Sequence, residues 1–158
     1  MAVFGGGVAA SNVPIDQSTP WIAAADGNLP LLQTALPQLN LSPSAADENG
    51  YTLIHAAASY AHLPVLQWLV SQGANVHAVD GEGDSALHYA SNRAAAEFLV
   101  REGKVSLDVR NQAGMTALQA KEEELKELME DEDFDEMDED AINLNGVIEF
   151  LKCVAMEQ

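Results

Sequence analysis

The stretch TLIHAAA, residues 52–58, decides the fold because it returns as SALHYAS at residues 85–91. The two histidines, His55 and His88, are therefore 33 residues apart. A fixed period of this size is typical of proteins in which one supersecondary unit stacks on copies of itself. The repeat predicts an extended stack of helix pairs in which each unit contacts only its neighbours.

Two further copies extend the repeat in both directions. The stretch NQAGMTALQAK begins one copy at Asn111, and WIAAADGNLPLLQTAL begins a weaker copy at Trp21 that no hairpin precedes. We therefore predict about four repeats and a flexible N-terminal segment rich in glycine. The predicted boundaries are 1–17 for that segment and 18–46, 47–79, 80–110 and 111–158 for the repeats.

Each recurring position has a physical role. The D-x-x-G tips predict tight β-turns, in which glycine adopts the backbone angles that larger residues resist. Thr52, Ser85 and Thr116 precede the first helices, where a hydroxyl caps the free backbone amides. The stretches VLQWLV and AAEFLV carry apolar residues at helical spacing. We expect Gly73 and Gly103 to end these second helices in the left-handed conformation.

The turn glycine, the T-x-L-H pattern and QGANVHAVD together resemble ankyrin repeats. The resemblance implies an all-α solenoid of helix pairs with short β-hairpin loops, and a protein-binding function without enzymatic activity. It also implies that His55 and His88 bridge backbone groups of adjacent loops. A zinc site would need converging ligands, and the only cysteine, Cys153, lies far along the chain from either histidine.

The charge of the chain is strongly negative, with 25 acidic and 7 basic residues and a formal net charge of -18. No Lys or Arg precedes Arg93. Such a chain is repelled by nucleic acid and by anionic membranes and is attracted to basic proteins. The apolar runs are too short for a membrane span, and no signal peptide is evident. We expect a soluble monomer in cytoplasm and nucleus, without a disulfide or a cofactor.

Residues 122–140 hold thirteen acidic residues and one base. We interpret them as an insertion that splits the last repeat. Its first half should continue a helix and dock Leu125, Leu128 and Met129 on the preceding repeat. From about Glu130, like charges oppose compaction and predict a flexible, extended loop. Two interpretations stay open: a solvated loop that only keeps the repeat soluble, or a surface that binds a basic segment.

The run DEDFDEMDED within this insertion also invites a calcium interpretation. An EF-hand loop that began at Asp131 would place Glu136 where glycine is required and Ile142 where a bidentate glutamate is required. The sequence therefore predicts no EF-hand there. Phe134 and Met137 lie among the acids without an evident core to enter, and they could contact the apolar parts of a basic partner.

Ankyrin repeats bind partners with their hairpin tips and with the concave face of their first helices, so the resemblance implies those positions as candidates here. For the tyrosines, merely covering a neighbouring repeat is an equal alternative. The candidate partner-binding residues, including those of the insertion, are Asp26, Glu48, Asn49, Tyr51, Ser59, Tyr60, Glu82, Asp84, Tyr89, Asn92, Gln112, Met115, Glu130, Asp131, Asp133, Phe134, Asp135, Met137 and Asp138.

A closer resemblance concerns WIAAADG, GYTLIHAAASYAH and DGEGDSALH. They are similar to small fungal ankyrin-repeat proteins that act as dedicated chaperones of a newly made ribosomal protein, in particular the large-subunit L-one stalk protein. This implies a basic ribosomal partner. The alternative is an ankyrin adaptor or inhibitor in signalling or transcription control, and a calcium-responsive acidic protein is a third possibility.

Overall fold

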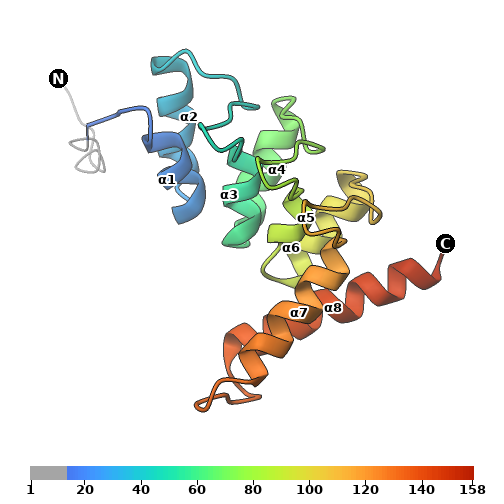
Figure 1. Ribbon diagram of the computed structural model, residues 1–158. Helices are drawn as coiled ribbons and strands as arrows, with labels where there is room; N and C mark the ends of the chain where they lie inside the picture. The colour runs from blue at the N-terminus through green and yellow to red at the C-terminus, as the bar shows by residue number, and fades with distance from the viewer. Residues whose placement is uncertain (1–13) are drawn as a thin grey trace.

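A computed structural model describes residues 14–158, so most of the predicted N-terminal segment lies outside the described residues. The described chain folds into four helix pairs (Figure 1). The helices are α1 (Thr19–Asp26) and α2 (Leu29–Gln38), α3 (Leu53–Ser59) and α4 (Leu63–Ser71), α5 (Ala86–Tyr89) and α6 (Arg93–Glu97) with its π-helical continuation η2 (Phe98–Glu102), and α7 (Ala117–Met129) and α8 (Glu139–Met156).

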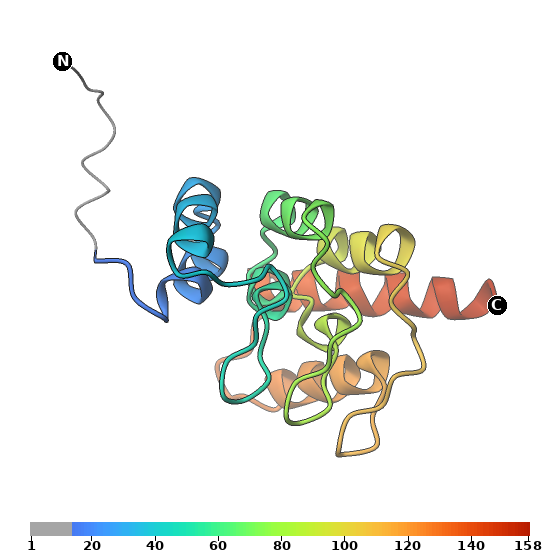
Figure 2. The ribbon, with the colours of Figure 1, turned by 90° about the horizontal axis from the view of Figure 1, so that it is seen from above.

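The pairs stack in two layers. Helices α1, α3, α5 and α7 contact one another in turn, and α4, α6 and α8 form the second layer. The loops between pairs project on the same side of the stack (Figure 2). Within residues 14–158 these loops contain no β-strand, and single antiparallel bridges, Ala46 with Thr52 and Val79 with Ser85, close the first two hairpins.

Small side chains allow the layers to pack closely. Ala56, Ala57, Ala95 and Ala96 are almost completely buried between helices, and larger side chains such as Leu66 fill the remaining space. Alanine gives both the highest helix propensity and the smallest helix diameter. A thin core of this kind depends on contacts between neighbouring pairs, as expected for a stacked repeat.

The predicted helix caps are confirmed at the first helices. Thr52, Ser85 and Thr116 each take part in a reciprocal capping box with the residue three positions later. Of the two glycines expected to be left-handed, only Gly73 is, with φ of 85°.

The prediction for Gly103 was wrong, because Lys104 adopts the left-handed conformation instead, with φ of 58°. The chain needs glycine at 103 because the backbone there passes close to Leu99 and Val76. A Cβ atom there would lie only 2.8 Å from the carbonyl oxygen of Leu99 and 3.0 Å from a side-chain carbon of Val76. Glycine is the residue that permits such contact with a neighbouring backbone.

The last pair is longer than the others, and Figure 1 shows it extending beyond the stack. Helix α7 runs to Met129 as expected, but of the three residues expected to dock on the preceding repeat only Leu128 lies beside it, at Ser91. Leu125 and Met129 lie beside Ile148 of α8 instead of on the preceding repeat, and Met129 stays 55% exposed. Whether α7 and α8 are a fourth ankyrin repeat split by an insertion stays a prediction.

The loop between α7 and α8 begins at Glu130, as the sequence predicted, but it forms turns where an extended segment was expected. Only residues 130–138 lie outside helices, and they form turns in which Asp131 and Asp135 accept bonds from backbone amides two residues later. Asp138 then caps α8 through the amide of Asp140. Acidic residues in the first turn of a helix interact favourably with its dipole, so the acidic run permits helix formation here.

Candidate protein-binding site

The two repeated histidines build the support beneath the hairpins. The Nδ1 atom of His55 accepts the backbone amide of Thr52 at 3.0 Å, and its Nε2 atom donates to the carbonyl of Asp84 in the next hairpin at 3.0 Å. His88 bonds the corresponding groups of Ser85 and Met115, at 3.1 and 3.0 Å. The bridging role that the resemblance implied is confirmed. Burial lowers the pKa of His55, and this favours the neutral ring that these two bonds require.

The hairpin tips are also bonded directly to one another. The amide of Gly81 donates to the carbonyl of Asn49 at 2.7 Å, and the amide of Gln112 donates to the carbonyl of Glu82 at 2.8 Å. A Cβ atom at Gly81 would lie 2.9 Å from the carbonyl oxygen of Asn49, so glycine permits this close approach. The hairpins therefore form a connected row.

A groove opens between the first two hairpins. We call it the hairpin groove. The aromatic rings of Tyr51 and Tyr89 meet edge to face there, with centroids 5.3 Å apart. The charged and aromatic residues that line the groove are Asp47, Glu48, Tyr51, Asp80, Glu82 and Tyr89. The groove thus combines aromatic surface with carboxylates from both hairpins.

Hydrogen bonds hold one of these carboxylates in its ionised form. Asp80 Oδ2 accepts the hydroxyl of Tyr89 at 2.5 Å, and Asp80 Oδ1 accepts the amides of Glu82 and Asp84, each at 2.9 Å. Partial burial opposes ionisation, but these bonds together hold the pKa of Asp80 below its ordinary value. Burial, reinforced by the bond to Asp80, raises the pKa of Tyr89. Asp80 is therefore negative at neutral pH while Tyr89 keeps its proton.

A second acidic depression lies on the last helix pair, and we call it the α7 depression. It is lined by Ser91, Lys121, Glu124, Glu127, Leu128, Asp131, Asp140 and Leu144. Lys121 is only 5% exposed, and its ammonium group binds the carboxylate of Glu124 at 2.9 Å. The chain therefore supplies a cation of its own to this depression.

The structure gathers part of the predicted site. Glu48, Asn49, Tyr51, Glu82 and Tyr89 all line the hairpin groove. Asp131 lies apart from them in the α7 depression.

Candidates on the first helices, α1 and α3, lie outside both surfaces. Asp26 is exposed at the end of α1, and Tyr60 is 61% exposed after α3. Ser59 does not line the groove, but its hydroxyl lies 3.2 Å from that of Tyr51, which does.

Several candidates instead have internal structural roles. The side chain of Asn92 caps α6, that of Gln112 donates to the carbonyl of Gly81, and Asp84 accepts a bond from Asn111. Met115 contributes its carbonyl to His88.

The candidates of the loop between α7 and α8 differ in exposure. Phe134 is half-buried, although the sequence suggested no core for it, and Met137 is 78% exposed. Asp138 caps α8. The remaining members of this loop, Glu130, Asp133 and Asp135, are exposed and line neither surface.

Sequence reasoning missed some residues of these surfaces. Asp47 and Asp80 occupy the same repeat position, and that recurrence was the available signal. Glu124 and Glu127 are three residues apart on α7, a spacing that places them on one face of the helix, and the following Asp131 lines the same depression.

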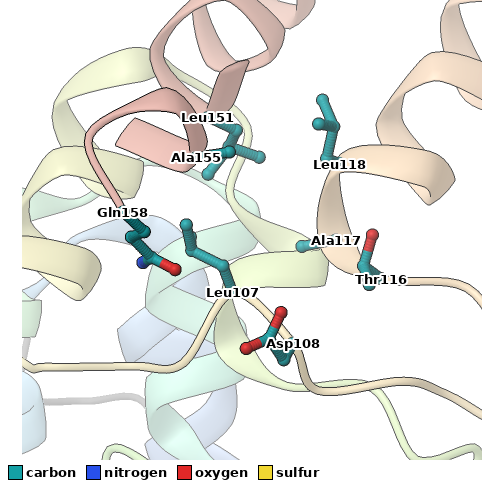
Figure 3. Close-up of a pocket in the computed structure, with 8 residues that line it drawn as sticks. All are labelled: Leu107, Asp108, Thr116, Ala117, Leu118, Leu151, Ala155 and Gln158. Carbon is teal, nitrogen blue, oxygen red and sulfur yellow. The ribbon is translucent and has the colours of Figure 1, made fainter. Parts of the chain in front are cut away.

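A separate small pocket of mixed polarity lies between the third hairpin and the last two helices. Apolar side chains such as Leu107, Leu118 and Leu151 line it together with the polar residues Asp108, Thr116 and Gln158 (Figure 3). Its volume of about 210 Å³ is below the range typical of small-molecule sites.

Across residues 14–158, no group of three or more His, Cys, Asp or Glu side chains converges to hold a metal ion. No helix in that range is long and apolar enough to cross a membrane.

Residues 20–111 match the family model described as ankyrin repeats, in three copies. An ankyrin repeat-containing protein of Schizosaccharomyces pombe is 38% identical over 99 residues, which cover 63% of this chain and 47% of that relative. The RelA-associated inhibitor of Mus musculus is 33% identical over 100 residues, covering 61% of this chain and 12% of the relative.

The NF-kappa-B inhibitor cactus of Drosophila melanogaster is 38% identical over 76 residues, covering 45% of this chain and 15% of the relative. The chain thus spans less than half the length of each of these three relatives. Two of the three are named as inhibitors, and none of the three names mentions a ribosomal protein.

Proposed function

Since the chain belongs to the ankyrin repeat family and is a protein-binding module, we propose that it is a dedicated chaperone of a basic, newly made ribosomal protein. The partner would bind across the hairpin groove and the layer formed by the first helices, α1, α3, α5 and α7. It would stay shielded until ribosomal RNA, a stronger polyanion, displaces the chaperone. No enzymatic step belongs to this function.

The observation that carries the proposal is the lack of cations at the hairpin groove. Among residues 14–158, none of the ion pairs involves Asp47, Glu48, Asp80 or Glu82. The chain places no Lys or Arg before Arg93. A basic partner would supply the missing positive charge, and complementary charge raises both specificity and the rate of association.

The acidic segment supports the same partner class. Residues 122–140 carry thirteen of the 25 acidic residues, and they extend from α7 through the loop into α8. Their field would attract a basic protein at long range, and it would weaken with salt because the Debye length is about 10 Å at about 0.1 M. Such a field would also hold an unassembled basic protein away from stray RNA.

Affinity capture from the native cell followed by mass spectrometry tests the proposal. The tagged full-length protein should recover one basic ribosomal protein at close to one copy per copy of bait. Translation inhibitors should reduce that recovery, because the proposed client is newly made. Recovery of regulatory proteins, with no basic ribosomal protein above background, would reject the chaperone.

A second candidate function is an ankyrin inhibitor or adaptor in signalling or transcription control. The names of two relatives, the RelA-associated inhibitor and the NF-kappa-B inhibitor cactus, favour it. The same capture separates the two functions, because an inhibitor should recover a regulatory protein whose yield is independent of ongoing translation.

A further inference from the structure

We propose that the hairpin groove binds an arginine side chain of the partner and prefers it to lysine. This inference rests on the proposed function, since it takes a basic partner as given, and it adds which side chain the partner presents. Its three supports are the aromatic surface of the groove, the free carboxylates at its edges and its rigidity.

The aromatic surface suits a guanidinium group. Tyr51 and Tyr89 both line the groove and meet edge to face, with Tyr51 also stacked on His55 at 5.5 Å between centroids. A planar guanidinium group stacks on an aromatic ring, whereas the compact, strongly hydrated ammonium group of lysine does so less well. Aromatic rings beside carboxylates thus favour arginine over lysine.

The carboxylates that remain free lie on opposite edges of the groove. Glu48 comes from the first hairpin and Glu82 from the second, both are exposed, and neither forms an ion pair with any residue in the range 14–158. Asp80, by contrast, is engaged by Tyr89 and by backbone amides. A guanidinium group, with five donors in a fixed plane, can bond a carboxylate with two parallel hydrogen bonds.

The groove is formed before a partner arrives. The bond between Gly81 and Asn49 fixes the spacing of the two hairpins, and Asp80 fixes the hydroxyl of Tyr89. His55 joins the first helix turn to the second hairpin from below. The groove itself therefore loses little conformational entropy when a side chain enters, and this favours binding.

The α7 depression is less suited to the same role. Lys121 already places its own buried ammonium group beside Glu124 there. Two more glutamates of α7, Glu123 and Glu122, are paired with Lys126 at 3.3 Å and Lys152 at 2.8 Å. The chain thus neutralises part of its acidic helix internally, while the groove keeps its charge for a partner.

The test uses two octapeptides, one of alternating glycine and arginine and one of alternating glycine and lysine. We would measure their affinities for the full chain by fluorescence anisotropy and map their contacts by amide chemical shifts in NMR. The wild type should bind the arginine peptide several-fold more tightly. The largest shifts should occur at Gly50 and Gly81 in the hairpin tips.

The variant Glu48→Gln/Glu82→Gln removes both free carboxylates with little change in shape. It should weaken binding of the arginine peptide about tenfold, since each exposed ion pair is worth up to roughly fivefold. The matched control Glu102→Gln/Glu149→Gln removes the same charge from exposed positions outside the groove and should weaken binding less than about twofold. Circular dichroism would verify that both variants remain folded.

Equal affinity for the two peptides, equal effects of the two double variants, or shifts confined to α7 would each overturn the arginine groove. If the chain still captures a basic ribosomal protein from cells, the proposed function survives that failure. If no basic protein is captured while the peptide results hold, the chaperone fails and the arginine groove remains.

Discussion

His55 and His88 perform the same task in successive repeats, at the scale of single bonds. Each imidazole accepts an amide at the start of its own helix and donates to a carbonyl of the next hairpin. The second bond joins one repeat to its neighbour, and stability in repeat proteins depends on such interfaces. These histidines therefore belong to the scaffold that shapes the hairpin groove.

Replacing His55 with alanine should lower the free energy of unfolding by about 2–4 kcal/mol. The substitution leaves a cavity and two unpaired backbone groups where the ring is completely buried. The control is His77→Ala, which removes an exposed side chain and should lower the free energy of unfolding by less than about 0.5 kcal/mol. Urea unfolding followed by circular dichroism measures both, and similar losses in the two variants would contradict the scaffold role.

The ionisation of His55 offers a separate test. Burial lowers its pKa below the ordinary value of 6.5, so the unfolded chain binds its proton more readily. The stability that His55 contributes is therefore complete above pH 6.5 and is lost as the pH falls toward the folded-state pKa. An NMR titration of its ring protons should give a midpoint below 6.5, and a midpoint at or above that value would refute the assignment.

Single residues also show what the sequence could predict. Caps such as Thr52 are local, because the hydroxyl binds an amide within the same turn, and they were predicted correctly. The roles of Gly103 and Lys121 depend on atoms that only folding brings near. Gly103 approaches Leu99 and Val76, and Lys121 is buried although three glutamates follow it directly in the sequence.

Helices α7 and α8 show how an acidic run can still form regular structure, at the scale of elements. Asp138 and the acids that follow it lie at the N-terminus of α8, where negative charge is favourable, whereas Glu127 and Glu130 lie at the unfavourable C-terminal end of α7. Helix polarity therefore stabilises one helix and opposes the other. Composition alone does not reveal this difference, so the sequence predicted an extended loop from about Glu130 to Asp140, whereas α8 already begins at Glu139.

A pair of charge reversals tests this account. Glu130→Lys should stabilise the protein by roughly 0.3–1 kcal/mol, because it places a cation at the end of α7 and removes repulsion with Glu127. Glu139→Lys makes the same change in net charge at the start of α8, and its effect should be less stabilising or destabilising. Hydrogen exchange of the helix amides measures both. Equal effects would mean that net charge alone governs this segment.

The whole molecule is a stack whose hairpins lie on one side and whose acids concentrate at its last helix pair (Figure 2). The solenoid was predictable, because its period and its turn residues repeat along the chain. The sequence did not predict that the acidic surface divides into an unpaired groove and a partly neutralised helix α7. That division depends on which carboxylates lie close to a lysine in the folded chain. The hairpin groove lacks such cations, while glutamates of α7 pair with Lys121 and Lys126 of the same helix and with Lys152 of α8.

The most direct test of the proposed charge-driven capture is the salt dependence of binding to the purified basic protein that the chain recovers from cells. The dissociation constant should rise steeply with salt between about 50 and 500 mM, because exposed charges attract one another across the interface. Replacing the acids of residues 130–140 with serine should weaken binding and make that dependence shallower. An affinity that is unchanged by salt, and unchanged by the serine replacements, would contradict capture through charge.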